Sequence, residues 1–298
     1  MKFKVQAFID YLSHEKHYSL HTIKAYENDL SDFSLFVKND LGEDDLVKVN
    51  YGQIRSWIVS LVDQNISAAS VNRKIASLKA FYKFLLKSKQ IGISPLVKHK
   101  SLKAAKKIQI PFSVQEVQKV LTSDFFDFDF EGIRDELIVN LFYATGVRRA
   151  ELIELKLADV DLSNGVIKVL GKRNKERLVP VVSEINCLVK AYLEQRSLLE
   201  VVQDEQFFFL TKKGKKLNVS LVYRVINSYF SNVTEKVKKS PHIMRHSFAT
   251  HLLNNGADIN SVKDLLGHSS LASTQVYTHN SLSELKRVHG VYHPRQKK

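Results

Sequence analysis

Residues 241–279 contain side chains that together could bind a phosphate and attack it. Arg245 lies between His242 and His246, and Tyr277 follows near the end of the segment. An arginine and histidines can hydrogen-bond the oxygens of a phosphate and stabilise the extra charge of its transition state. A tyrosine oxygen can form a covalent intermediate. Such chemistry can cut DNA without a metal or water.

The charge of the chain favours a polyanionic partner. Its 298 residues include 45 Lys and Arg against 31 Asp and Glu, which gives a formal net charge of +14. Such an excess suits a protein that binds nucleic acid or an anionic membrane surface. No long apolar run and no amphipathic anchor stand out, so no membrane partner is expected. Double-stranded DNA is the predicted partner.

The single cysteine, Cys187, excludes an internal disulfide and fits a reducing compartment. Its neighbours are rich in leucine and valine, so we expect Cys187 to pack in a core and not to act as a nucleophile. The first residues lack the apolar segment and cleavage site of a secretory leader. We therefore expect a cytoplasmic protein.

Two patterns imitate metal sites, and both are rejected. His242 and His246 have the spacing of a helical zinc pair, but Ile243 stands where a metalloprotease has glutamate. Residues 127–132 resemble the start of a calcium loop, but Ile138 occupies the position of its bidentate glutamate. No metal and no cofactor are expected.

Residues 1–97 are predicted to form an N-terminal helical domain. Apolar side chains recur every three or four residues in four segments. Ser19 and Ser67 precede the second and fourth segments and can cap helices there. The pattern predicts a four-helix bundle, and the periodicity alone does not indicate DNA.

A basic linker is predicted at residues 98–110. The fourth helix is expected to end at Ser94 and Pro95, because proline disfavours helix in the residue before it. The linker contains five lysines and no acidic residue: Lys98, Lys100, Lys103, Lys106 and Lys107. Such a run can be a merely solvated surface. Because it supplies five of the 14 net charges, we favour contact with DNA.

Residues 111–298 are predicted to form a second domain. Residues 166–170 and 177–182 are rich in β-branched residues and flank a polar turn, which indicates a hairpin. Residues 207–210 are a candidate third strand, and helices are expected to resume at about Val219. The predicted fold class is mainly α with a small antiparallel β-sheet.

The C-terminal motifs resemble the tyrosine recombinases, the family of the phage integrases and the Xer chromosome-dimer recombinases. The family signature, His-x-x-Arg-His, then Leu-Gly-His, then Tyr, is matched by residues 242–246, residues 266–268 and Tyr277. Residues 144–152 resemble the first arginine box of the family. Residues 171–177 resemble its lysine-bearing hairpin loop. The matched order and spacing make the resemblance specific.

The resemblance implies six catalytic residues: Arg148, Lys172, His242, Arg245, His268 and Tyr277. Tyr277 matches the nucleophile of the family, and Lys172 matches its general acid. The arginines and histidines match groups that bind the phosphate oxygens. Glu151 is expected to position Arg148, and His246 to support the site. Without the family, Arg148 would be interpreted as a surface ion pair and Lys172 as part of a solubilising turn.

Two positions depart from the family pattern. Ala150 replaces the usual serine, which removes a hydrogen bond near the site, and Arg173 replaces a common glycine in the lysine loop. The residues expected to contact DNA are Arg73, Lys98, Lys100, Lys103, Lys106, Lys107 and Arg173. Residues 19–33 and 67–85 resemble the core-binding domain of the family, so the N-terminal helices are expected to bind DNA too.

The resemblance, closest to the Xer subgroup in residues 288–295, implies a recombinase that acts at a dif-like site without metal or ATP. It implies a tetramer, made of one protein or with a second Xer-type recombinase, and suggests a septal DNA translocase as a further partner. A mobile-element integrase or invertase, a type IB topoisomerase and a non-catalytic sequence-specific DNA-binding protein are the alternatives. An apolar stripe, Leu282, Leu285, Val288 and Val291, predicts a terminal helix. This helix is expected to dock on a neighbouring subunit, or else to pack on its own domain.

Overall fold

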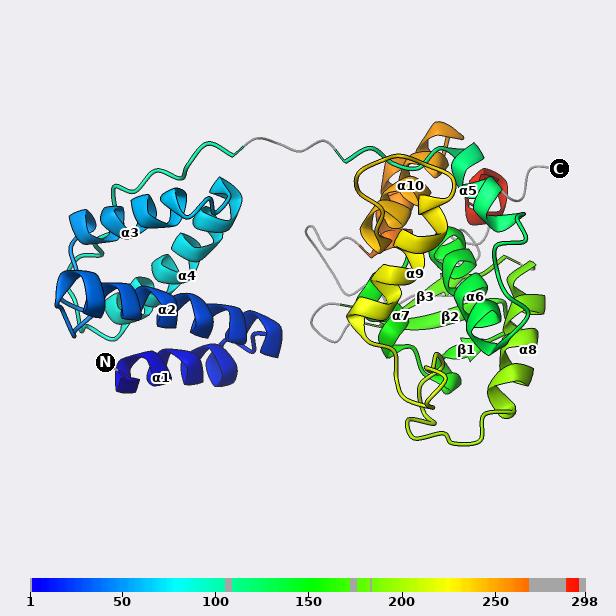
Figure 1. Cartoon of the computed structure of the whole chain (residues 1–298), viewed down its shortest axis with the longest axis horizontal. Helices are drawn as coiled ribbons and strands as arrows, with labels where there is room; N and C mark the ends of the chain where they lie inside the picture. Colours follow the sequence, from blue (N-terminus) through cyan, green and yellow to red (C-terminus); the bar gives the residue numbers. More distant parts are fainter. Residues whose placement is uncertain (1, 105–108, 172–175, 183, 268–287, 295–298) are drawn as a thin grey trace. The chain divides into compact units, whose positions relative to one another are not determined.

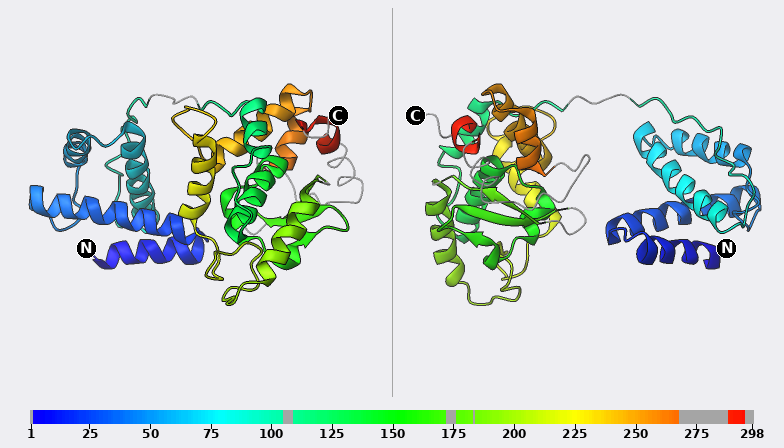
Figure 2. Two further views of the ribbon diagram at one scale, coloured as in Figure 1. Left: turned by 45° about the vertical axis from the view of Figure 1, so that its right-hand side comes forward. Right: turned by 180° about the vertical axis from the view of Figure 1, so that it is seen from behind.

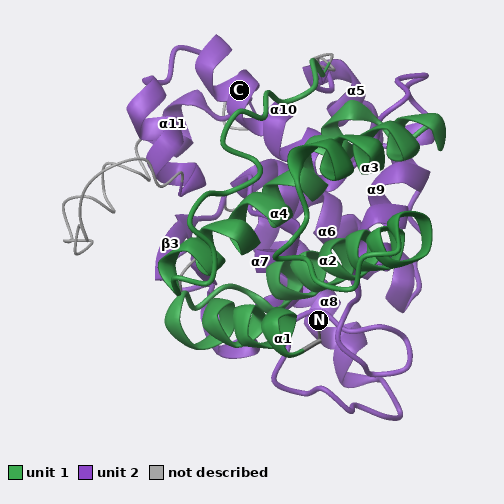
Figure 3. Cartoon of the chain, turned by 90° about the vertical axis from the view of Figure 1, so that its left-hand side faces the viewer, with its two compact units in different colours: residues 1–107 green, residues 108–298 purple. Residues whose placement is uncertain are grey.

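The computed structural model describes residues 2–104, 109–171, 176–182, 184–267 and 288–294. The chain divides into two compact units, residues 1–107 and residues 108–298, which Figure 3 shows in different colours. Each unit has its own hydrophobic core, and each is described by itself.

The first unit is a bundle of helices (Figure 1). Its elements are α1 (Lys2–Asp10), the π-helical turn η1 (Tyr11–Glu15), α2 (Leu20–Leu41), α3 (Tyr51–Asp63) and α4 (Ala68–Lys87). Ser19 and Ser67 cap α2 and α4, because each side chain accepts a hydrogen bond from the backbone N–H three residues later. Apolar side chains on the inner faces, such as Phe33 and Trp57, form the core. The predicted helical bundle is confirmed.

The end of α4 differs from the prediction. The helix ends at Lys87 and not at Ser94 and Pro95. Lys89 adopts a left-handed backbone conformation, with φ of 55°, and an α-helix cannot continue through that conformation. The proline rule therefore identified a true boundary of helix but placed it several residues too late.

The first part of the predicted linker is attached to the first unit. Leu96 is buried in the helical core. The side chain of Asn72 makes two 2.9 Å hydrogen bonds with the backbone of Leu102, one to its carbonyl oxygen and one from its N–H. The backbone is thus fixed to α4 as far as Leu102. Three lysine side chains of this segment are exposed: Lys98, Lys100 and Lys103.

The second unit is mainly helical and contains one small sheet (Figures 1 and 2). Its helices are α5 (Val114–Leu121), α6 (Phe130–Thr145), α7 (Arg149–Glu154), the 3₁₀ turn η2 (Leu157–Asp159), α8 (Glu184–Ser197), α9 (Val219–Ser231), α10 (Pro241–Asn254) and α11 (Ile259–Leu266). α6 lies at the centre of the unit and packs against α5, α8, α9 and α10. Its residues from Leu137 to Thr145 are all buried.

The sheet has three antiparallel strands in the order β1 (Val160–Asp161), β2 (Val166–Leu170) and β3 (Glu176–Pro180). β2 and β3 form the predicted hairpin, in which Val169 pairs with Arg177. The third strand is β1, so the prediction of a strand at residues 207–210 is wrong. That segment makes only isolated bridges at Phe207 and Leu210.

Residues 207–210 resemble a strand in composition because they fill the core. The side chains of Phe208 and Phe209 are 1% exposed, and that of Leu210 is fully buried. The hydroxyl of Tyr192 donates to the Phe208 carbonyl at 3.0 Å and accepts from the Leu210 N–H at 2.9 Å. A side chain thus satisfies backbone groups that a neighbouring strand would otherwise bind.

Cys187 also differs from the expectation, because it is exposed. It lies on α8, where Ile185, Val189 and Tyr192 are the buried residues. These three positions follow a helical spacing of four and three, and Cys187 falls between them on the other face. The apolar composition of the segment reflected the buried face and not the face of the cysteine.

Candidate active site

Arg148 is placed by a tight turn between α6 and α7. Gly146 ends α6 with a left-handed backbone, φ of 60°. A Cβ atom at this position would overlap the ring of Phe248, so only glycine allows α10 to approach so closely. Arg148 then forms the N-cap of α7. The Thr-Gly-x-Arg pattern is therefore a helix end followed directly by a helix start.

Glu151 holds Arg148 at the beginning of α7. The Glu151 carboxylate accepts hydrogen bonds from the Arg148 backbone N–H at 2.8 Å and from Arg148 Nη1 at 2.6 Å. Burial alone would raise the pKa of Glu151, but the guanidinium groups of Arg177 and Arg148 hold this pKa below its ordinary value. The carboxylate is charged at neutral pH and acts as an anchor, which agrees with the predicted positioning role.

Arg177 is a buried residue of this site whose importance the sequence reasoning missed. It pairs with both oxygens of Glu151, at 2.7 Å from Nη1 and 2.8 Å from Nη2, and its side chain is 6% exposed. A buried charge that loses its partner costs roughly 3–5 kcal/mol, so the pair also matters for stability. The available signal was an arginine directly before the apolar run 178–182.

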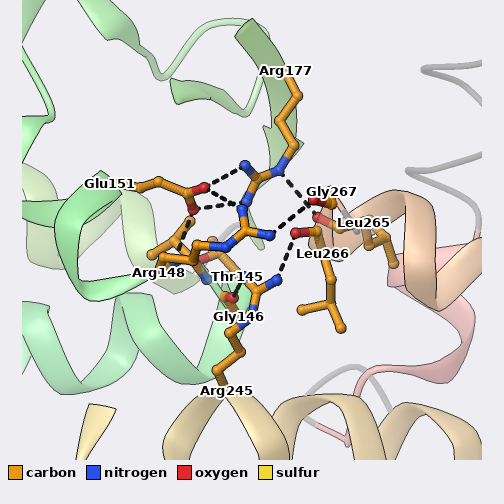
Figure 4. A network of polar contacts seen from close by, with 10 residues as sticks. Thr145, Gly146, Arg148, Glu151, Arg177, Arg245, Leu265, Leu266 and Gly267 are labelled. Carbon is orange, nitrogen blue, oxygen red and sulfur yellow. Dashed lines mark hydrogen bonds and ion pairs between the residues drawn. The ribbon is translucent and has the colours of Figure 1, made fainter. Parts of the chain in front are cut away.

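Arg245 points from α10 toward Arg148 (Figure 4). Pro241 occupies the first turn of α10, where its missing N–H costs nothing. Arg245 donates from Nη1 to the Gly146 carbonyl and from Nη2 to the Leu266 carbonyl, both at 2.6 Å. Burial, and then the nearby charge of Arg148, lower the pKa of Arg245 to about 10. The guanidinium therefore stays charged at neutral pH.

Three arginines bind three successive carbonyl oxygens at the end of α11 (Figure 4). Arg177 donates to Leu265 at 3.4 Å, Arg245 to Leu266 at 2.6 Å and Arg148 to Gly267 at 2.9 Å. The last carbonyls of a helix lack partners within it and carry partial negative charge. The arginines satisfy them, and the Leu-Gly part of the Leu-Gly-His motif is thereby joined to both arginine boxes.

His242 begins the turn of α10 that carries Arg245 and is exposed. Burial first, and then the positive charges of Arg149, Arg245 and Lys238, lower the pKa of His242 below the ordinary 6.5. The imidazole is therefore neutral at neutral pH and can either donate or accept a hydrogen bond. His246, one turn later, is exposed and takes no part in the hydrogen bonds of the network as the structure describes it.

The other predicted site residues lie outside the described residues. They are Lys172, Arg173, His268 and Tyr277, together with Lys106 and Lys107. Of the predicted catalytic set, the structure thus brings together Arg148 and Arg245 and places His242 one helical turn from Arg245.

Arg73, a predicted DNA contact in the first unit, is paired within the protein. Its Nη1 and Nη2 atoms donate to the Asp29 carboxylate at 2.5 and 2.8 Å. Asp29 is 1% exposed and also accepts from Lys74 and Ser77. Because the side chain of Arg73 is 52% exposed, this ion pair leaves room for a contact with DNA.

Buried hydrogen bonds hold α10 in place. The hydroxyl of Ser247 accepts from the Phe112 N–H at 2.8 Å, and His251 Nε2 lies 2.9 Å from the Phe112 carbonyl. The ring of His251 also lies 3.0 Å from the hydroxyl of Tyr143. All of these groups are buried, so they fix the helix that carries Arg245.

Residues 288–294, the described part of the C-terminal tail, pack on the rest of the second unit. His289 Nε2 lies 2.5 Å from the Ala144 carbonyl, and His293 Nε2 lies 3.0 Å from the Tyr143 carbonyl. Val288 is 3% exposed, whereas Val291 is 51% exposed. The prediction of one apolar face through both valines is therefore wrong for Val291, because Val288, His289 and His293 make the inner contacts.

Among the residues that the structure describes, no group of three or more His, Cys, Asp and Glu could hold a metal ion. None of the helices that the structure describes is long and apolar enough to cross a membrane.

Comparison with known proteins identifies the family. Residues 112–284 match the phage integrase family, and residues 5–89 match the N-terminal SAM-like domain of phage integrases. The tyrosine recombinase XerC of Chlorobaculum parvum is 36% identical, over 97% of this chain and 94% of its own. The XerD of Staphylococcus haemolyticus is 34% identical over 98% of both chains.

Solved structures agree with this assignment. XerH recombinase bound to its difH substrate has a TM-score of 0.68 and 26% identity, over 89% of this chain and 79% of its own. The Tn1549 transposon integrase, bound to circular intermediate DNA, has a TM-score of 0.70 at 20% identity, over 94% and 98% of the two chains. The latter likeness concerns the fold alone. With relatives matching along nearly its whole length, the chain belongs to the phage integrase family of site-specific tyrosine recombinases.

Proposed function

We propose that this chain cuts and rejoins double-stranded DNA through a 3′-phosphotyrosine at Tyr277, and that it resolves chromosome dimers at a dif-like site. The observation that carries the catalytic part is the convergence of Arg148 and Arg245 at the end of α11. Each guanidinium has five N–H donors. The carbonyl and carboxylate contacts occupy only part of them, which leaves donors for the oxygens of a phosphate.

In the first step, the Tyr277 oxygen attacks the phosphorus of one strand. A bond forms between phosphorus and the tyrosine oxygen, and the bond to the 5′ oxygen breaks. The proton of the tyrosine passes to His268 or to solvent, and Lys172 gives a proton to the leaving 5′ oxygen. Arg148, Arg245 and neutral His242 bind the non-bridging oxygens, whose charge increases in the transition state.

In the second step, the 5′ hydroxyl of the partner strand attacks the phosphotyrosine. The tyrosine leaves and recovers its proton, and one phosphodiester replaces another. The number of phosphodiester-type bonds is the same before and after. The proposed reaction therefore needs no ATP, and Arg148, Arg245 and His242 supply the charge stabilisation for which other phosphoryl transfers use a metal ion.

A nicked suicide substrate tests this proposal. Cleavage releases a short fragment that carries the 5′ hydroxyl, so religation fails and the covalent complex accumulates. We expect a protein–DNA adduct that survives a denaturing gel with the natural chain and not with Tyr277→Phe. A non-catalytic DNA-binding protein would give a band shift but no adduct, and an adduct formed by Tyr277→Phe would exclude Tyr277 as the nucleophile.

The proposed dif-like role is supported by the XerC and XerD relatives and by the XerH structure with difH. The acting assembly would be a tetramer on two sites, formed by this chain alone or with a second Xer-type recombinase. A septal DNA translocase is the activating partner to be tested. Footprinting on chromosomal fragments would locate the site, and a site found only at the ends of a mobile element would favour an integrase or invertase instead.

A further inference from the structure

Arg177 contacts the same helix end as the two candidate catalytic arginines, and it is buried like Arg245, whereas the side chain of Arg148 is 33% exposed. It extends from β3, pairs with Glu151 on α7 and donates to the Leu265 carbonyl at the end of α11. Figure 4 shows it on the opposite side of the Glu151 carboxylate from the start of α7. One buried side chain thus joins the sheet, α7 and α11.

The Glu151 carboxylate is shared between Arg148 and Arg177. Oε1 accepts from Nη1 of Arg148 at 2.6 Å and from Nη1 of Arg177 at 2.7 Å. Oε2 accepts from the Arg148 N–H and from Arg177 Nη2, both at 2.8 Å. Four accepted bonds occupy both oxygens, so the orientation of the carboxylate is fixed.

The charges of this cluster explain why a second arginine matters. Glu151 supplies one negative charge, and Arg148, Arg177 and Arg245 supply three positive charges. With Arg177 present, the carboxylate divides its attraction between two guanidiniums. Without it, Arg148 would be the sole strong partner of a buried carboxylate, and the low local dielectric would strengthen that pairing. Arg148 would then be drawn away from Gly267 and from a bound phosphate.

Arg177 also touches Gly267 directly. A Cβ atom on Gly267 would lie 2.9 Å from Cδ and 3.0 Å from Nε of Arg177, and the φ of Gly267 is +62°. The arginine stem therefore packs against one side of the glycine, while Arg148 binds its carbonyl at 2.9 Å. Gly267 is the last residue before His268 in the sequence, so this contact determines the point from which the chain continues to a candidate catalytic histidine.

We propose that Arg177 is a positioning residue for strand cleavage. It orients and partly neutralises Glu151, which keeps Arg148 available to the phosphate, and it supports the end of α11 before His268. This inference rests on the proposed function. Its effect should appear in the chemical step at saturating protein and not in affinity for DNA.

The test uses the full chain and single-turnover cleavage of the suicide substrate, at saturating protein and well below the melting temperature of the weakest variant. We expect Arg177→Met to slow adduct formation by about 10-fold to 100-fold, the range seen when partners that orient the ligands of metal sites are removed. Arg177→Lys keeps the charge but loses the paired donors, so its cleavage rate should lie between the rates of Arg177→Met and of the natural chain. Half-site affinity should stay within about 3-fold of the natural chain.

A double variant distinguishes a role of Arg177 in positioning Arg148 from a role in stabilising the fold alone. In Arg177→Met/Glu151→Gln the lone buried carboxylate is gone, so Arg148 is released and cleavage should be faster than in Arg177→Met. Arg134→Met is the matched control, because Arg134 is 2% exposed and paired with Asp135 on α6 but shares no hydrogen bond with the site network. It should lower the melting temperature and leave the cleavage rate of the folded protein unchanged.

Three outcomes would overturn the inference: Arg177→Lys or Arg177→Met cleaving at the natural rate, a double variant no faster than Arg177→Met, or Arg134→Met slowing cleavage equally. If Arg177→Met does not fold, the cleavage rate of Arg177→Lys decides the matter. Failure of the proposed function gives a different result, because the natural chain itself would then form no adduct that depends on Tyr277.

Discussion

The Nη2 group of Arg245 donates a 2.6 Å hydrogen bond to the carbonyl oxygen of Leu266. This bond connects the second arginine box to the helix end that leads into His268. The first box reaches the same helix end through Arg148 and Gly267. Motifs far apart in the chain therefore meet at two consecutive backbone carbonyls, and the geometry of each arginine depends on that meeting point.

Replacing either candidate catalytic arginine by lysine should abolish most cleavage although the charge is kept. Arg245 donates to Gly146 and Leu266 from two different nitrogens, and a single ammonium group cannot reproduce that span together with a phosphate contact. We expect Arg245→Lys and Arg148→Lys each to lower the cleavage rate by roughly 10²–10³. Single-turnover adduct formation is the measurement, and Arg224→Lys, an exposed arginine of α9, is the control. Near-natural rates in both variants would show that these arginines are structural.

The decline of the cleavage rate at acidic pH, the acidic limb of the pH profile, should report the protonation of His242. Because burial and then Arg149 lower the pKa of His242, the imidazole should stay neutral until the pH falls below about 6.5. Cleavage that needs neutral His242 should be flat above that value and decline below it. Arg149→Met removes a positive neighbour, so the limb should move to higher pH, whereas Lys190→Met on α8 should leave it unchanged. If the acidic limb stays at the same pH in Arg149→Met, the group whose protonation slows cleavage is not His242.

The fold was predictable where local signals determine it. Ser19 and Ser67 mark helix starts because a side chain satisfies nearby N–H groups, and the hairpin follows from β-branched runs around a turn. The prediction of a strand at residues 207–210 was wrong because burial on all sides and strand formation favour the same residue types. Sequence alone did not place Cys187 on the exposed face, since a single polarizable side chain fits either face of α8.

The site was predictable in its parts and not in its assembly. The arginine boxes pointed to Arg148 and Arg245, and the resemblance to the first box suggested the role of Glu151. Arg177 was missed because its partners, Glu151 and Leu265, are 26 and 88 residues away in the chain. Such a network depends on the tertiary fold, and the local signs of it were a charged residue beside the apolar run 178–182 and the final arginine of the lysine-loop motif.

Binding should depend strongly on salt, with a contribution from the linker. If the protein makes about 6–10 phosphate contacts, affinity should fall roughly 10³–10⁵ between about 50 and 200 mM salt. Replacing the five linker lysines by glutamine should flatten the slope of log affinity against log salt by up to about 0.9 per lysine that contacts phosphate. Glutamine at the exposed Lys212, Lys213 and Lys215 is the comparison. An unchanged slope in the linker variant would mean that the linker faces solvent.

Acid should weaken the catalytic unit through His289. Burial lowers the pKa of this histidine, although its bond to the Ala144 carbonyl opposes the shift. The unfolded chain therefore takes up a proton first, near the ordinary pKa of 6.5. The stabilising contribution is fully present above that pH and is lost as the pH falls through the lower folded value.

His289→Gln keeps an amide donor but does not titrate. It should cost about 1–3 kcal/mol at neutral pH and reduce the fall in stability between pH values of about 7.5 and 5.5. Thermal unfolding at both pH values measures this, and His246→Gln at an exposed site of α10 is the control. An equal fall in His289→Gln and the natural chain would assign the acid sensitivity to other groups, such as buried His251.

Removing residues 283–298 should destabilise the catalytic unit and not leave it intact. The truncation deletes Val288, which is 3% exposed, and the histidines that bind the Ala144 and Tyr143 carbonyls. Losing one buried valine and two buried hydrogen bonds should cost at least about 2 kcal/mol. Removal of residues 295–298 alone keeps all of these groups and should leave the melting temperature unchanged. Equal stability of the two truncated chains would show that residues 288–294 do not support the unit.

Docking of the tail on a neighbouring subunit needs a test that leaves this packing in place. Val291 supplies one, because its side chain is 51% exposed on the segment whose histidines point inward. Val291→Lys should not alter stability, since a lysine at an exposed helix position costs little. If the outer face of the tail contacts the next subunit, as a heterologous contact in a ring would require, the lysine should weaken cooperative filling of the second half-site. A gel-shift titration on DNA with one and two half-sites measures this. Unchanged cooperativity with unchanged half-site affinity would mean that the exposed face of the tail around Val291 is not the subunit contact.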